Sequence, residues 1–98
     1  GPNMFIIFLK FSANKAAASE FMAAHNQWIA SGFEDGAFQC VGSLTPAGGG
    51  AVLAIGESRD DIAARVNADP FVINDVVTAE IIEVDVKKTA PGLDALKA

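Results

Sequence analysis

The chain contains one cysteine and one histidine, and each shortage excludes a class of site. A single cysteine cannot form an intrachain disulfide, so a reducing cytoplasm is the expected setting. One histidine and one cysteine without a repeated ligand spacing do not make a zinc site. The sequence also lacks the GxSxG pattern of a serine nucleophile. No metal and no other cofactor is therefore expected.

Basic residues are also few. Seven Lys and Arg residues stand against twelve Asp and Glu residues, which gives a formal net charge of -5. Nucleic acid and anionic membranes attract clustered positive charge, and Lys87-Lys88 is the only adjacent basic pair. No apolar run reaches the roughly eighteen residues of a membrane span. Neither nucleic acid nor a membrane is an expected partner.

What the chain does have is apolar residues. Of its 98 residues, 51% are hydrophobic and 19% are charged, which excludes disorder and predicts one folded domain. We expect this domain over 4–88, with 1–3 as a cloning remnant and 89–98 as a C-terminal tail. The hydrophobic fraction is high for a small monomer, so a partner subunit is expected to cover part of the surface.

The hydrophobic periodicity predicts strands and helices in the order βαββαβ. The expected strands are 4–11, 36–44, 52–55 and 76–86. The expected helices are 16–31, ended by Gly32, and 58–68, followed by a short turn or helix after Asp69-Pro70. This order predicts a ferredoxin-like α+β fold, in which a four-stranded antiparallel sheet carries two helices on one face. The other face would be apolar and uncovered, so two sheets are expected to pair in a homodimer.

His25 is the candidate for proton transfer. With Phe21 and Trp28 it follows the i, i+4, i+7 pattern of one face of the first predicted helix. An imidazole can accept and return a proton near neutral pH. A lone histidine on an apolar helix face is, however, more often a packed core residue. From the residues alone, both interpretations stay open.

Asp69 and the turn around Ser43 have similarly ambiguous patterns. Asp followed by Pro is typical of a helix N-terminus, yet the same carboxylate could orient His25 and stabilise its imidazolium form. Its two oxygens would allow capping and orienting to be shared. Gly42 permits close backbone approach and Ser43 offers a hydroxyl to a ligand, but ordinary turn chemistry explains both.

The order and spacing of these pieces resemble the YciI-like (YCII-related) family of small dimeric α+β barrel proteins. The features that carry the resemblance are an apolar first strand, His25 with Trp28 and Gly32, Gly42-Ser43-Leu44-Thr45-Pro46, and Ala68-Asp69-Pro70-Phe71. The resemblance implies a dimer whose protomers have a pocket between sheet and helices, and a His-Asp pair that falls on His25 and Asp69. The family includes a dehydrochlorinase of a chlorinated hydroxyhydroquinone.

The resulting hypothesis is a cofactor-free lyase or isomerase that acts on a small cyclic or aromatic hydroxy compound. His25 would be the general base and then the general acid, while Asp69 would orient it. The expected substrate-binding residues are Phe21, Trp28, Gly42, Ser43 and Phe71. The alternatives are a non-enzymatic small-molecule binding or accessory protein, in which His25 only lines the pocket, and a structural dimer without a cavity.

Overall fold

The first strand lies in the middle of the sheet. In the computed structural model, which describes residues 3–97, β1 (Met4–Phe11) pairs antiparallel with both β3 (Gly50–Ala54) and β4 (Val77–Val84). The edge strand β2 (Phe38–Ser43) pairs with β3 and completes the order β2-β3-β1-β4. This is the ferredoxin-like α+β arrangement that the sequence predicts, so the predicted fold class is confirmed.

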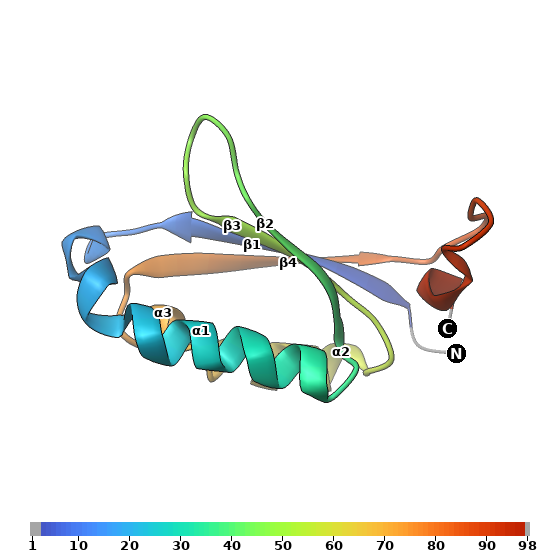
Figure 1. Ribbon diagram of the computed structural model, residues 1–98, viewed down its shortest axis with the longest axis horizontal. Coiled ribbons are helices and arrows are strands. Elements are labelled where there is room, and N and C mark those ends of the chain that lie inside the picture. Colours follow the sequence, from blue (N-terminus) through green and yellow to red (C-terminus); the bar gives the residue numbers. More distant parts are fainter. Residues whose placement is uncertain (1–2, 98) are drawn as a thin grey trace.

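The helices cover one face of this sheet. The long α1 (Ala18–Glu34), the shorter α2 (Arg59–Asn67) and the single-turn α3 (Pro70–Ile73) lie on the same side (Figure 1). In β1, every second residue points toward them, and Phe5, Ile7 and Leu9 are buried. The residues between these three are also apolar and face the open side of the sheet, where they stay partly exposed.

The prediction that Gly32 ends the first helix is wrong. The helix continues to Glu34, and Gly32 is buried in its last turn, where an added Cβ would lie 2.1 Å from the ring of Phe38. Gly32 therefore permits a close approach between α1 and β2. Gly36, with a φ of 76°, takes the left-handed position that follows the helix end.

The two shorter helices each begin after a residue whose side chain caps the first turn. The Ser58 hydroxyl accepts a hydrogen bond from the Asp61 N–H at the start of α2, and Asp69 accepts one from the Phe71 N–H at the start of α3. Pro70 occupies the first turn of α3. Trp28 joins α1 to α2, because its Nε1 donates to the Arg65 carbonyl over 2.9 Å.

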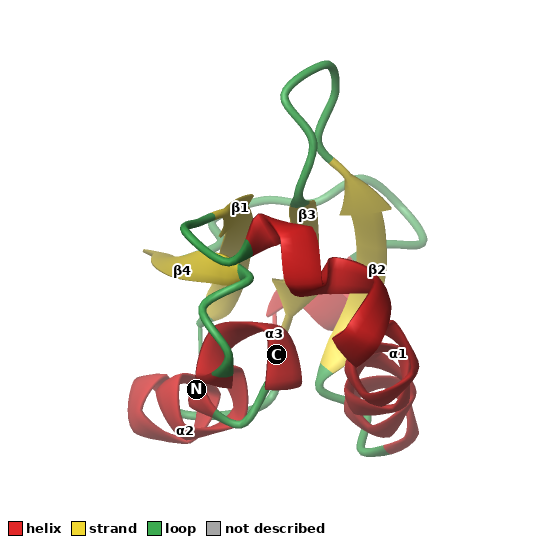
Figure 2. Ribbon diagram, turned by 90° about the vertical axis from the view of Figure 1, so that its left-hand side faces the viewer, coloured by secondary structure: helices red, strands yellow, loops and turns green. Residues whose placement is uncertain are grey.

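Two segments extend beyond the sheet. The loop between β2 and β3 projects on the side opposite the helices (Figures 1 and 2). The predicted tail contains the 3-10 helix η2 (Asp94–Lys97), and a second short 3-10 helix, η1 (Lys15–Ala17), precedes α1. Residues 1 and 2 of the predicted remnant, and Ala98, lie outside the described residues. No helix in the described part is both long and apolar enough to cross a membrane.

Candidate active site

His25 and Asp69 form a buried hydrogen bond. The imidazole Nδ1 lies 2.7 Å from Oδ1 of Asp69, although the two residues are 44 positions apart in the chain. Their side chains are 11% and 0% exposed. The middle of α1 supplies the histidine and the N-cap of α3 supplies the carboxylate. An ionised carboxylate only accepts hydrogen bonds, so with Asp69 in that form Nδ1 carries the hydrogen, and in the neutral form of the ring Nε2 then has a lone pair.

One oxygen of Asp69 makes both of the contacts that the sequence predicts. Oδ1 accepts the hydrogen bond from His25 and also the one from the Phe71 N–H, at 2.9 Å. Oδ2 is buried and has no hydrogen-bond partner among the described residues. The sharing expected between two oxygens does not occur. Capping and orienting are therefore coupled through a single atom.

Two aromatic rings pack against the imidazole. The ring of Phe71 is almost parallel to it, with centroids 3.9 Å apart and planes 6° apart. The ring of Trp28 lies at 5.7 Å and 25°. Both side chains are more than nine-tenths buried. The carboxylate of Asp69 thus holds the imidazole at Nδ1, and the two aromatic rings stack against its flat surface.

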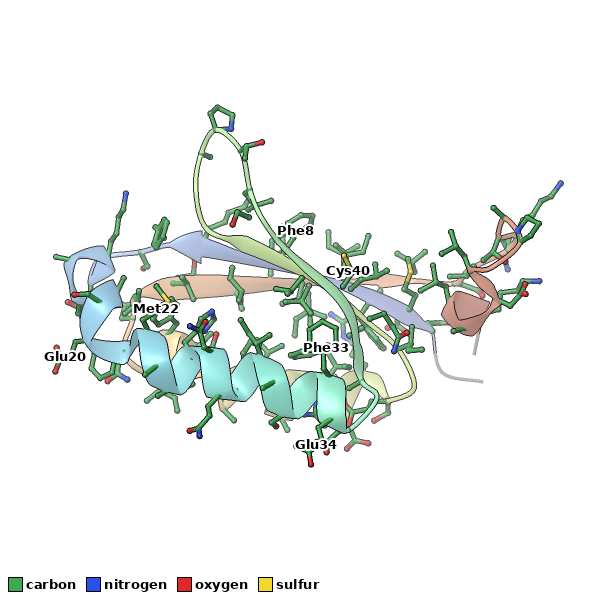
Figure 3. The ribbon with its side chains drawn as sticks, viewed as in Figure 1. Phe8, Glu20, Met22, Phe33, Glu34 and Cys40 are labelled. Carbon is green, nitrogen blue, oxygen red and sulfur yellow. The ribbon has the colours of Figure 1, made fainter. Side chains whose placement is uncertain are left out.

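A cavity of about 390 Å³ opens beside His25, between α1 and the sheet. Apolar side chains and glycines make up most of its wall, including Leu9 and Val52 from the sheet. Met22 lines it from α1, in the space between the helix and the strands (Figure 3). The polar side chains of the lining are His25, Asn26 and Ser43, and none of the lining residues carries a fixed charge.

The structure separates the predicted substrate-binding residues into two groups. Gly42, Ser43 and Phe71 line the cavity together with His25. Phe21 and Trp28 are not among the lining residues. Phe21 packs against the hydrophobic core. Trp28, which stacks on His25, donates a hydrogen bond to the Arg65 carbonyl.

Sequence reasoning missed the residues that α1 does present to the cavity. These are Met22, Asn26 and Ile29, which also follow the i, i+4, i+7 spacing. The signal is therefore present in the sequence, one residue along from the series that contains His25.

The glycine run 48–50 after the turn has the composition of a flexible connection. In the structure, however, Gly49 lies against β1, where an added Cβ would be 2.3 Å from the Leu9 carbonyl oxygen.

An ion-pair network around Arg65 helps to hold Trp28, which stacks on His25. Arg65 donates to both carboxylate oxygens of Glu57, at 2.9 and 3.0 Å, and to Asp35 at 3.0 Å. The hydrogen bonds with Glu57 raise the pKa of Arg65 above its usual value, against the effect of burial. The network fixes the last turn of α2, where the Arg65 carbonyl accepts the hydrogen bond from Trp28. The described residues include no cluster of three or more His, Cys, Asp or Glu side chains suited to a metal ion.

Comparison with known proteins supports the fold. No family model and no curated protein matches the chain. Among solved structures, the chain is similar to 5-chloro-2-hydroxyhydroquinone dehydrochlorinase (TftG) from Burkholderia phenoliruptrix AC1100, in complex with 2,5-dihydroxybenzoquinone. The TM-score is 0.68 and the sequence identity 18%, over 81% of this chain and 90% of that one. This likeness shows a shared fold, while membership of the YciI-like family stays a prediction.

Proposed function

We propose that this protein is a cofactor-free lyase or isomerase that transfers a proton on a small cyclic or aromatic hydroxy compound. The observation that carries the proposal is the buried hydrogen bond between His25 and Asp69 at the wall of an apolar cavity. The fold shared with TftG, a dehydrochlorinase whose structure holds 2,5-dihydroxybenzoquinone, supports the same class of ligand.

The proposed reaction begins at Nε2 of His25. Its lone pair takes a proton from a C–H or O–H group of the ligand, and the ring becomes an imidazolium. Asp69 stays ionised and balances the new positive charge through Nδ1. In an isomerase, Nε2 returns the proton to another atom of the ligand. In a lyase, the electron pair left on the ligand forms a double bond as an anionic group leaves.

The cavity favours this chemistry in two ways. Its volume of about 390 Å³ lies at the lower end of the usual range for small-molecule sites. The Ser43 hydroxyl, the Asn26 amide and the backbone near Gly42 can donate hydrogen bonds to a ligand oxygen that becomes negative. Because the remaining wall is apolar, such bonds are stronger than they would be in water.

The proton-transfer step is tested by hydrogen exchange into bound ligands. A panel of phenols and cyclic ketones, with 2,5-dihydroxybenzoquinone as the first probe, is screened by thermal shift, since a ligand of the folded state raises the melting temperature. Ligands that bind are then incubated with the protein in D₂O, and the loss of C–H signals is followed by NMR.

We expect wild-type protein to accelerate the exchange and His25→Gln to lower its rate by at least about 100-fold. The matched control is Gln27→Ala, which changes an exposed residue of the same helix outside the cavity lining and should keep the exchange. Equal rates for His25→Gln and wild type would refute the proposed function. Saturable binding with no exchange by wild type would show a binding protein in which His25 only lines the cavity.

We also propose that two copies of the chain pair through the open face of the sheet. Ile6 faces this side, and its neighbours across the ladder, Leu53 and Ile82, face it too. Phe8 and Cys40 project from the same face in Figure 3. A sheet face of this composition is stabilised when a second copy covers it.

The exposed free thiol of Cys40 supports a reducing compartment such as the cytoplasm.

A further inference from the structure

Phe71 contacts both members of the pair. Its backbone N–H donates to the same Oδ1 of Asp69 that accepts from His25. Its ring covers a face of the imidazole at 3.9 Å and 6°. A residue at the second position of a single-turn helix thus meets the carboxylate with its backbone and the imidazole with its side chain.

The hydrogen bond at Nδ1 does not by itself fix the imidazole. The terminal torsion of a histidine side chain has broad minima, so the ring can tilt, which lengthens the bond between Nδ1 and Oδ1 and lets the hydrogen move between the two nitrogens. Such a tilt moves Nε2, which lies on the far side of the ring. A parallel aromatic face in contact removes this freedom, because tilting would drive the imidazole into the ring of Phe71.

Phe71 is itself firmly held. The Phe71 carbonyl accepts from the Val76 N–H at 2.9 Å, and the Asn74 amide donates to the Pro70 carbonyl at 2.8 Å. The Asn14 amide donates to the Asn74 carbonyl from the segment before α1. These bonds fix α3 at both of its ends, and only 5% of Phe71 is exposed.

We infer that Phe71 is a positioning residue, which holds the imidazole of His25 so that Nε2 faces the cavity. The inference rests on the proposed function, in which Nε2 exchanges the proton. It also sets the direction from which a ligand approaches. Since Phe71 occupies one face of the imidazole, a ligand cannot reach His25 from that face.

The chain offers a clean measurement, because His25 is its only histidine. In tag-free, ¹⁵N-labelled protein, at a pH where titration has shown the imidazole to be neutral in each variant, the imidazole gives one pair of nitrogen signals. A fixed ring with its hydrogen on Nδ1 keeps these two signals far apart. A ring that moves between orientations and tautomers averages them toward each other.

The test variant is Phe71→Leu, which keeps the backbone N–H and the apolar bulk but removes the flat face. We expect the two nitrogen signals to converge and the rate constant for proton exchange on bound 2,5-dihydroxybenzoquinone, or on the tightest-binding compound of the panel, to fall about 10- to 100-fold. The control is Phe5→Leu, which shortens an equally buried aromatic in β1 away from the cavity. It should leave both readouts at wild-type values.

Wild-type signal separation in folded Phe71→Leu would overturn the inference, and Phe71→Met serves as the second variant if the first does not fold. The two proposals fail differently. If wild type exchanges no ligand proton but the signals still converge in Phe71→Leu, the positioning role holds and the proposed function is refuted. If wild type exchanges protons and Phe71→Leu matches it in both readouts, the positioning role is refuted and the proposed function stands.

Discussion

At the scale of single residues, the carboxylate of Asp69 couples local structure to chemistry. Its Oδ1 caps α3 and orients His25, and its Oδ2 is buried without a partner in the described part of the chain. Burial of an unpaired carboxylate oxygen is costly. The position therefore keeps a carboxyl group beside the imidazole at the expense of stability, as sites with a chemical role often do.

Replacing Asp69 with asparagine separates the two contributions of the carboxylate. The new side-chain amide would retain an acceptor oxygen for His25 and Phe71, but its buried NH₂ group would lack a partner and it would carry no charge. We expect Asp69→Asn to lower the free energy of unfolding by about 1–3 kcal/mol. Proton exchange on a bound ligand should fall by at least about 100-fold, because the imidazolium is no longer stabilised.

Urea unfolding and the D₂O exchange assay measure the two effects separately. Asp69→Ala is the comparison variant, which also removes the helix cap and should cost a further ~1 kcal/mol. An Asp69→Asn protein that exchanges protons at the wild-type rate would show that the carboxylate has only a structural role.

At the scale of elements, the approach of α1 to β2 depends on Gly32. The ring of Phe38 lies against this glycine and is 1% exposed. It also packs edge-on against Trp28, with centroids 5.1 Å apart. Trp28 in turn stacks on His25. A displacement at Gly32 is therefore transmitted to the candidate site through two aromatic contacts.

Gly32→Ala tests this arrangement because two effects oppose each other. In a helix interior, alanine is more favourable than glycine by about 1 kcal/mol. Here, however, the new Cβ would lie 2.1 Å from a buried ring, and overpacking of this kind costs about 1–3 kcal/mol or more. We expect the variant to be less stable than wild type in urea unfolding.

The control for helix propensity is Ala24→Gly, at an exposed position of the same helix, which should lose about 1 kcal/mol. If Gly32→Ala were instead more stable than wild type, the close contact between α1 and β2 would not exist in solution.

The same elements show what the sequence could predict. The short run of aromatic and β-branched residues in β1 and the caps at Ser58 and Asp69 are local signals, and they place this strand and the short helices correctly. The role of Gly32 was misjudged because it depends on contact with Phe38, which the local sequence does not contain. The lining residues Met22, Asn26 and Ile29 were missed for a related reason, since the packing of α1 against the sheet decides which of its side chains face the cavity.

The pairing of His25 with Asp69 was predictable as residue types, with help from the family resemblance. Its atomic detail was not. The use of Oδ1 for both hydrogen bonds and the parallel ring of Phe71 follow from the placement of α3 against α1. That placement depends on contacts between residues far apart in the chain.

At the scale of the whole molecule, the sheet has two unlike faces. One is buried under the helices, and the other is largely apolar and uncovered, with Ile82 41% exposed near its middle and Glu80 beside Phe8. The β2–β3 loop projects from this second side (Figure 1). The proposed dimer would cover this face, which is otherwise apolar and exposed although the chain as a whole has a net charge of -5.

Ile82→Lys is expected to convert the dimer to a monomer, because pairing would bury the new charge without a partner. Sedimentation velocity at micromolar concentration measures the change, and circular dichroism checks that the protomer stays folded. Ile73→Lys is the control, since Ile73 is 65% exposed but lies on the helical side. A wild-type protein that sediments as a monomer at these concentrations would contradict the pairing.

The most direct test of the account is the response of the His25 nitrogens to a ligand. The ¹⁵N signals of the single imidazole are followed while 2,5-dihydroxybenzoquinone, or the tightest-binding compound of the panel, is added to saturation. We predict that the Nε2 signal moves along the binding curve while Nδ1 keeps its hydrogen and its bond to Asp69. Saturable binding that leaves the Nε2 signal unchanged would contradict the claim that this nitrogen meets the ligand.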